Sequence, residues 1–212
     1  MKTIDIKTAL SLPVFSHAML KEVLKKDIKN INDKIANLVN SGEIIRLKRG
    51  FYILSKPYLD RPIDLISVAN MLYSPSYVSL DYALSYYGMI LERVSEVTSV
   101  TSKNAKFFDT PIGRFSYKKA SLNAFSLGVD WLEDEKNGGK FIATPEKALC
   151  DKIRYDRGMG TLTQKQMREY IVYDLRLDLH FELNYLLVEK IANAYKSKNL
   201  VTLATMLQKR KI

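Results

Sequence analysis

The sequence of 212 residues has little of the chemistry that builds metal centres, disulfides or covalent catalytic sites. Cys150 is its single cysteine, and its two histidines, His17 and His180, are far apart in the chain. A lone cysteine excludes an internal disulfide, and the lack of a Cys/His cluster argues against a zinc module. We therefore expect a reducing compartment, and the apolar neighbours of Cys150 predict a buried helix residue rather than a nucleophile.

Long apolar runs and the common catalytic motifs are also missing. No apolar run approaches the length of a membrane span, and the N-terminus lacks the pattern of a signal peptide. No glycine-rich phosphate loop, His-Glu zinc helix or Ser/His/Asp set is evident. These absences predict a soluble, cytoplasmic protein that is not an enzyme and needs no metal and no cofactor.

Positive charge is what the sequence has in excess. The net charge is +10, and 47% of the residues are hydrophobic, which is ample for a core. Residues 1–58 hold eleven Lys/Arg against five Asp/Glu, whereas residues 59–212 hold twenty-two against eighteen. More than half of the net charge thus lies in the first quarter of the chain, which favours a polyanionic partner, because neutralised phosphates release condensed counterions.

A helical pattern runs into a basic turn within the first fifty-odd residues. Asn30–Ser41 has the spacing of an amphipathic helix, and Gly42 is a typical helix stop. Two short apolar strands, Ile44–Leu47 and Phe51–Leu54, then flank the turn Lys48–Gly50. A helix followed at once by a basic-tipped hairpin is the outline of a winged helix, whose helix enters the DNA major groove.

The segment before this helix completes such a module. Ser16 can cap a helix that ends near Leu24, and Lys25–Lys29 is short and polar enough for the turn of a helix-turn-helix. Pro13–Phe15 is predicted to be a small strand that pairs with the hairpin. The alternative is a generic small α+β unit with a solvated lysine-rich turn.

The helix phase selects the candidate DNA contacts. Asn37 lies on the outer face, where it can pair with adenine, while Lys29 and Lys34 suit phosphate. Asp33 on that face would repel phosphate, so it should accept from a cytosine amino group or point away. The wing tip gives the surest contacts, Lys48 and Arg49. The full predicted DNA-binding set is Lys29, Asn32, Lys34, Asn37, Arg46, Lys48 and Arg49.

Residues 62–212 are predicted to form a second domain after a linker at Ser55–Pro62. The expected helices and strands follow in order: a helix over Asp64–Tyr73, a helix capped by Ser79 and ending at Tyr87, a strand at Val97–Thr101, a hairpin around Pro111–Gly113, strands at Ala124–Val129 and Lys140–Ala143, and helices over Glu146–Tyr155, Gln164–Tyr173, Phe181–Tyr195 and Leu200–Lys209. The predicted fold class is α+β. A winged helix-turn-helix domain (1–58) precedes a mixed α/β domain with a mainly antiparallel sheet and a helical tail.

Several blocks of this chain resemble the AbiEi-type antitoxins of bacterial abortive-infection (type IV toxin–antitoxin) systems. The blocks span roughly residues 40–155 in the expected order, and their succession is more specific than any single block. They are Leu47-Lys48-Arg49-Gly50-Phe51-Tyr52, the run from Tyr77 to Gly88, Thr98-Ser99-Val100-Thr101, Gly113-Arg114-Phe115-Ser116-Tyr117, and the run from Ile142 to Leu149. Beyond about Tyr155 the match is only in being helical.

The resemblance implies a winged helix that represses the antitoxin–toxin operon and a C-terminal domain that counteracts a nucleotidyltransferase-like toxin without a stable complex. The expected partners are double-stranded DNA of the protein's own promoter, functionally the toxin, and a second copy on DNA as a possible homodimer. Exposed cations of the second domain could form one positive antitoxin face toward an anionic partner such as RNA, and the favoured alternative is that they are ordinary solvated side chains. These residues are Lys103, Lys106, Arg114, Lys118 and Lys119.

Two other functions stay open at the level of sequence. One is a winged-helix regulator whose second domain senses a small ligand or partner. The other is a metal-dependent nuclease, since Asp134-Glu135-Lys136 with Asp130 upstream has the carboxylate–lysine spacing of such enzymes. That segment looks more like a solvated hairpin tip, so the nuclease is the less favoured of the two.

Overall fold

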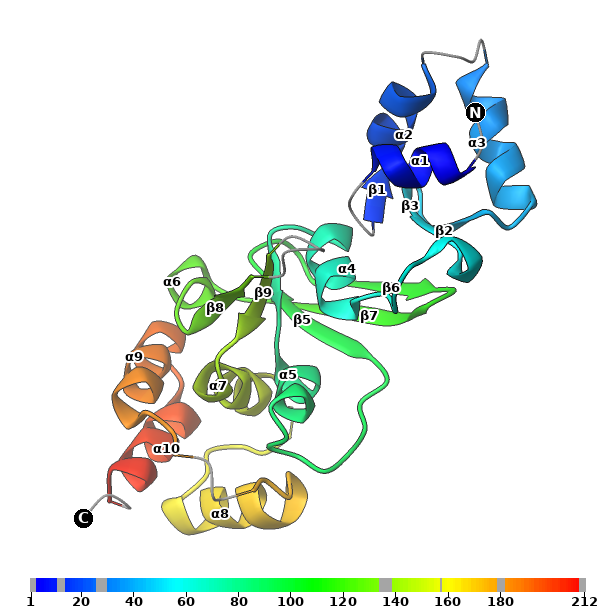
Figure 1. Cartoon of the computed structure of the whole chain (residues 1–212). Helices are drawn as coiled ribbons and strands as arrows, with labels where there is room; N and C mark the ends of the chain where they lie inside the picture. Colours follow the sequence, from blue (N-terminus) through cyan, green and yellow to red (C-terminus); the bar gives the residue numbers. More distant parts are fainter. Residues whose placement is uncertain are drawn as a thin grey trace.

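The chain folds as a mixed α+β structure with two β-sheets and a helical C-terminal part (Figure 1). The computed structural model describes residues 3–10, 14–25, 30–133, 139–156, 158–178 and 182–209. Within these ranges, no helix combines the length and the apolar content that crossing a bilayer would require.

The N-terminal unit alternates helices with a small antiparallel sheet. Its elements are α1 (Thr3–Ala9), β1 (Val14–Ser16), α2 (His17–Leu24), α3 (Ile31–Asn40), β2 (Ile44–Lys48) and β3 (Phe51–Leu54). The strand order is β1-β3-β2, so the first strand pairs with the hairpin as the sequence predicts. Ser16 and Asn30 cap α2 and α3, each accepting a bond from a backbone N–H of the first turn. Helix α1 was not expected from the sequence.

The three-stranded sheet is buried on both faces. One face carries Phe15 and Tyr52, which stack in register and belong to the core under α1, α2 and α3. The other face carries Val14, Leu47 and Ile53, which join the core of the C-terminal part. Alternation of side chains along the strands thus gives this sheet two different partners.

The C-terminal unit is built around a six-stranded mixed sheet of order β6-β7-β5-β4-β9-β8. Its strands are β4 (Ser76–Val78), β5 (Val97–Thr101), β6 (Lys106–Thr110), β7 (Gly113–Lys119), β8 (Val129–Leu132) and β9 (Lys140–Ala143). Its helices are η1 (Lys56–Tyr58), α4 (Leu65–Leu72), α5 (Leu80–Tyr86), α6 (Leu122–Phe125), α7 (Pro145–Tyr155), α8 (Gln164–Glu169) with the π-helical η2 (Tyr170–Asp174), α9 (Tyr185–Tyr195) and α10 (Lys198–Lys209). Helices α5, α7, α9 and α10 gather on the side of this sheet away from the N-terminal unit (Figure 1).

Most predicted elements are confirmed, but the strand predicted at Ala124–Val129 is wrong. That segment holds the short helix α6 and a turn at Gly128, whose φ of 65° does not occur in a strand, and β8 begins only at Val129. The sheet is also more mixed than expected, because β4–β9 and β5–β7 are parallel pairs.

Two smaller corrections concern the connections. Ser79 stands at the N-cap position of α5 but makes no capping bond with its side chain. The predicted linker after the wing contains the turn η1, where Tyr58 and Leu59 pack against the N-terminal core. The connection between the two units is therefore packed against the N-terminal core.

Candidate nucleic-acid interface

The outer face of α3 carries amide side chains. Asn32, Asn37 and Asn40 are exposed, whereas Ile35 and Leu38 are buried in the N-terminal core. The predicted helix phase is therefore confirmed. An asparagine amide can donate and accept at once, which is the pattern that an adenine edge presents in the major groove.

Asp33 has a structural partner at the start of α3. Asn30 caps the helix by accepting from the backbone N–H of Asp33 at 3.4 Å, and the Asn30 side-chain amide donates back to the Asp33 carboxylate. A carboxylate in the first helical turn also faces the positive end of the helix dipole. The acidic residue on this face thus stabilises the helix end.

The tip of the β2–β3 hairpin, α2 and α3 meet around His17. The His17 backbone N–H donates to the Gly50 carbonyl at 2.8 Å, and its Nε2 lies 3.1 Å from the Asn32 side-chain oxygen. Gly50 has a φ of 79°, a left-handed conformation that favours glycine at the hairpin tip. These contacts fix the hairpin tip beside the N-terminal end of α3.

The expectation that Lys48 reaches DNA from the wing tip has to be corrected. Its ammonium donates to the Leu72 carbonyl and lies 4.2 Å from the ring centre of Phe51 and 5.0 Å from that of Phe108. Burial lowers the pKa of Lys48, and the nearby charges of Lys106 and Lys103 lower it further. Lys48 therefore connects the hairpin to the C-terminal unit, and in this structure its ammonium is directed to that unit.

The remaining predicted contacts differ in exposure. Arg46 and Arg49 are exposed on the hairpin, and Lys34 is half-buried on α3. Lys29 lies outside the described residues. Of the predicted cationic contacts in the described part of the N-terminal unit, Arg46 and Arg49 are therefore the exposed ones.

The five cations of the predicted antitoxin surface do not form one face. In β7, Arg114 and Lys118 point to one side of the sheet, and Lys119 points to the other, because side chains alternate along a strand. Lys106 pairs in register with Tyr117 and so shares the side of Lys119. The prediction of a single positive face is wrong for this reason, although all five side chains are exposed.

Arg114 and Lys118 lie in surroundings that do not favour an anion. Arg114 pairs in register with Asp109, and its guanidinium lies 5.5 Å from the ring centre of Phe107. Lys118 lines a polar cavity that contains more carboxylates than cations. Its charged lining residues are Asp81, Glu92, Glu96, Asp156, Asp174, Arg93, Lys118 and Lys152.

The other cations gather next to the hairpin. Lys103 donates to the Ser74 carbonyl at 2.6 Å, and Lys106 lies 5.9 Å from the ring centre of Phe108, the same ring that Lys48 approaches. Lys103 and Lys106 are both exposed. Positive charge from Lys48, Lys103 and Lys106 thus gathers where the hairpin meets the C-terminal unit, which was not expected from the sequence.

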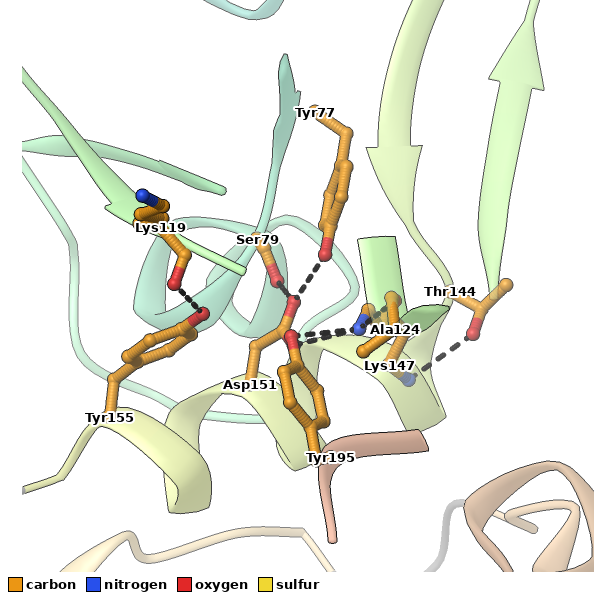
Figure 2. Close-up of polar contacts among 9 residues, drawn as sticks. All are labelled: Tyr77, Ser79, Lys119, Ala124, Thr144, Lys147, Asp151, Tyr155 and Tyr195. Carbon is orange, nitrogen blue, oxygen red and sulfur yellow. Dashed lines mark hydrogen bonds and ion pairs between the residues drawn. The ribbon is translucent and has the colours of Figure 1, made fainter. Parts of the chain in front are cut away.

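A buried polar network joins β4, α7 and α9 in the C-terminal unit (Figure 2). The Asp151 carboxylate accepts from the Tyr195 hydroxyl at 2.6 Å on one oxygen and from the Ser79 and Tyr77 hydroxyls at 2.7 and 3.1 Å on the other. Lys147 completes the set with its Nζ 3.0 Å from Oδ1. Burial, followed by the charge of Asp151, raises the pKa of both tyrosines, which keeps them protonated as donors.

Lys147 is fully buried and fully satisfied. Besides Asp151, its ammonium donates to the Ala124 carbonyl at 2.8 Å and to the Tyr195 hydroxyl at 3.0 Å, which uses its three N–H groups. Both charged side chains have zero exposure. A buried pair with every bond made fixes the packing of its neighbours and offers no access to a substrate.

The sequence alone does not reveal this network. Its pattern around Lys147 indicates helix-start chemistry, although a Lys–Asp pair four residues apart on a helix with apolar Ala148, Leu149 and Cys150 between them is a usable signal. Cys150 itself is buried as predicted, and burial raises the pKa of its thiol.

Among the described residues, no group of three or more His, Cys, Asp and Glu side chains is placed to hold a metal ion. The predicted nuclease residues Asp134–Lys136 lie outside these residues, and Asp130 is exposed on β8. No family model matches the chain, and no curated protein matches it.

Proposed function

We propose that this protein is a DNA-binding antitoxin that represses its own toxin–antitoxin operon and counteracts a nucleotidyltransferase-like toxin. The observation that carries the DNA-binding part is the helix–strand–helix–helix–hairpin order of the N-terminal unit, with an exposed amide face on α3 beside the hairpin tip. We interpret this unit as a winged helix. The antitoxin part is supported by the resemblance of the sequence blocks.

In this proposal α3 lies in the major groove, and Asn37 reads a base. Arg49 at the hairpin tip and Arg46 beside it contact the backbone, where cations set affinity and orientation but not sequence. Lys103 and Lys106 extend the backbone contacts from the C-terminal unit. Lys48 fixes the hairpin to the C-terminal unit through its bond to the Leu72 carbonyl.

A binding titration on the DNA upstream of the protein's own gene tests the proposal, with a shuffled duplex of equal length as control. The expected result is tighter binding to the upstream DNA, together with rescue of cells that express the neighbouring toxin gene. Equal affinity for both duplexes would contradict a specific repressor. Metal-dependent cleavage of a plasmid by the pure protein would favour the nuclease instead.

The second candidate is a winged-helix regulator that responds to a small molecule. An apolar cavity where the two units meet favours it. The two candidates differ in toxin rescue, which a ligand-responsive regulator without antitoxin activity would not give.

A further inference from the structure

A cavity of about 610 Å³ lies where the N-terminal unit meets the C-terminal unit. Pockets for small organic ligands commonly have volumes of about 300–1,000 Å³. Ser16, Met19 and Phe51 line it from the N-terminal unit. The other lining residues come from α4, β4, α6, β8, β9 and their connections: Asn70, Met71, Ser74, Pro75, Ser76, Tyr77, Phe125, Ser126, Val129, Trp131, Gly139 and Phe141.

The lining selects an uncharged, aromatic ligand. None of the described residues that line the cavity is charged, and five are aromatic: Phe51, Tyr77, Phe125, Trp131 and Phe141. An ionised ligand would lose its hydration without gaining a counter-charge, which is unfavourable. A planar ring, in contrast, can stack against several of these side chains.

One polar group in the lining lacks a partner. Ser76 is only 5% exposed, and its hydroxyl has no hydrogen-bond partner among the described residues. By strand alternation, however, Ser76 points to the same face of the sheet as Val78 and Ile142, whereas Trp131 and Phe141 point to the opposite face. The Ser76 hydroxyl therefore does not face these two rings, and recognition of a ligand depends on the aromatic lining.

Trp131 is a preformed wall of this cavity. Its ring centre lies 4.6 Å from that of Phe141, yet the two side chains are 51% and 44% exposed. A Cβ at Gly139 would lie 1.6 Å from the indole, so the ring rests directly on the glycine backbone. Two large exposed rings held in this way offer a stacking surface.

We propose that this cavity binds a small, uncharged aromatic molecule that stacks on Trp131 and Phe141. Because the cavity is lined by both units, the bound molecule contacts both of them. This proposal does not depend on DNA binding, and none of the described residues that line the cavity is among the predicted DNA contacts.

Trp131 is the single tryptophan of the chain, so its fluorescence reports on the site directly. The probe is N-phenyl-1-naphthylamine, which is uncharged, aromatic and carries one N–H. The matched probe is 1-anilinonaphthalene-8-sulfonate, which adds a sulfonate to the same ring system. We expect saturable quenching of Trp131 with one equivalent of the neutral probe bound, and at least tenfold weaker binding of the anion.

Two variants locate the site, and a third controls for them. Ser126→Phe fills the cavity from an exposed position and should abolish binding. Phe141→Leu should weaken binding roughly 2- to 12-fold, which corresponds to the loss of one aromatic contact. Ser121→Phe, at an exposed serine on the same helix with no capping bond, should bind like the native chain.

Several results would overturn the proposal. These are no saturable quenching in the folded native protein, equal affinity for the anionic probe, or unchanged binding in Ser126→Phe with a native thermal melt. Unchanged affinity in a folded Phe141→Leu variant would overturn the assigned stacking on that ring.

Discussion

At the scale of single residues, two neighbouring cations of the hairpin have different surroundings. Arg49 is exposed at the tip, whereas Lys48 is bonded to the Leu72 carbonyl. We expect Arg49→Ala to reduce the slope of log K against log[salt] by about 1, because one phosphate contact is lost. Lys48→Ala should leave the slope unchanged and lower the melting temperature. Binding titrations at several salt concentrations measure this, and equal slopes in the two variants would contradict it.

A second pair of neighbours tests the outer face of α3. Asn37 is exposed, and Leu38 is 1% exposed in the N-terminal core. Asn37→Ala should cost roughly 1–3 kcal/mol on the specific site and little on random DNA. Leu38→Asp should unfold the N-terminal unit, because it buries an unpaired charge. If Asn37→Ala weakens binding equally on both DNAs, the residue only positions the helix.

The buried pair Lys147–Asp151 is a third residue-scale case. Lys147→Met leaves the Asp151 carboxylate buried without its counter-charge, so we expect a loss of roughly 3–5 kcal/mol in the free energy of unfolding. Asp151→Leu should be similarly costly, while the double variant should lose clearly less than the sum. Urea unfolding of the four proteins gives the coupling energy. Strictly additive losses would mean that the two charges stabilise the fold independently.

At the scale of elements, Gly128 and Gly88 form a matched pair. Both have left-handed backbones, with φ of 65° and 70°. A Cβ at Gly128 would lie 2.9 Å from the Lys147 Cβ, whereas one at Gly88 would meet nothing within 4 Å. Gly88→Ala should therefore cost about 1–2 kcal/mol for the backbone alone, and Gly128→Ala should cost more. Thermal and urea unfolding compare them, and equal losses would show that the turn near Lys147 relaxes freely.

The elements also show how much of the fold could be predicted from the sequence. Helix α3, the hairpin and α7 were predictable, because periodicity, a capping residue and a turn signal agree at each of them. The segment Ala124–Val129 was not, since a short apolar run does not distinguish helix from strand. Its helix α6 is held by a tertiary contact, the bond from Lys147 to the Ala124 carbonyl.

The candidate site also has features that could be predicted from the sequence and features that could not. Exposure of Asn37 and Arg49 follows from local patterns of helix and turn. Two other features depend on which strands pair: the bond from Lys48 to the Leu72 carbonyl, and the placement of Lys106 and Arg114 on opposite sides of the sheet. Local periodicity does not determine the order of strands in a sheet. Long-range pairing therefore decided which of the predicted cations share a surface.

At the scale of the whole molecule, the three-stranded sheet is shared by two cores. Val14, Leu47 and Ile53 are buried against the C-terminal unit, so residues 1–62 alone would expose this apolar face. The predicted boundary near residue 58 divides the sequence into two parts, but side chains from both parts pack against each other across it. An isolated N-terminal unit would therefore hold an apolar sheet face in contact with water.

We expect a fragment of residues 1–62 to associate or unfold, and the substitutions Leu47→Thr and Ile53→Thr to make it more soluble and monomeric. In the full chain the same two substitutions should lower the melting temperature, because both side chains are at most 5% exposed there and lose buried apolar groups. The substituted fragment should bind the upstream DNA more weakly than the full chain, since it lacks Lys103 and Lys106. Sedimentation, thermal melts and binding titrations measure the three effects. An unsubstituted fragment that is monomeric and melts like the full chain would show that the C-terminal unit does not support the sheet.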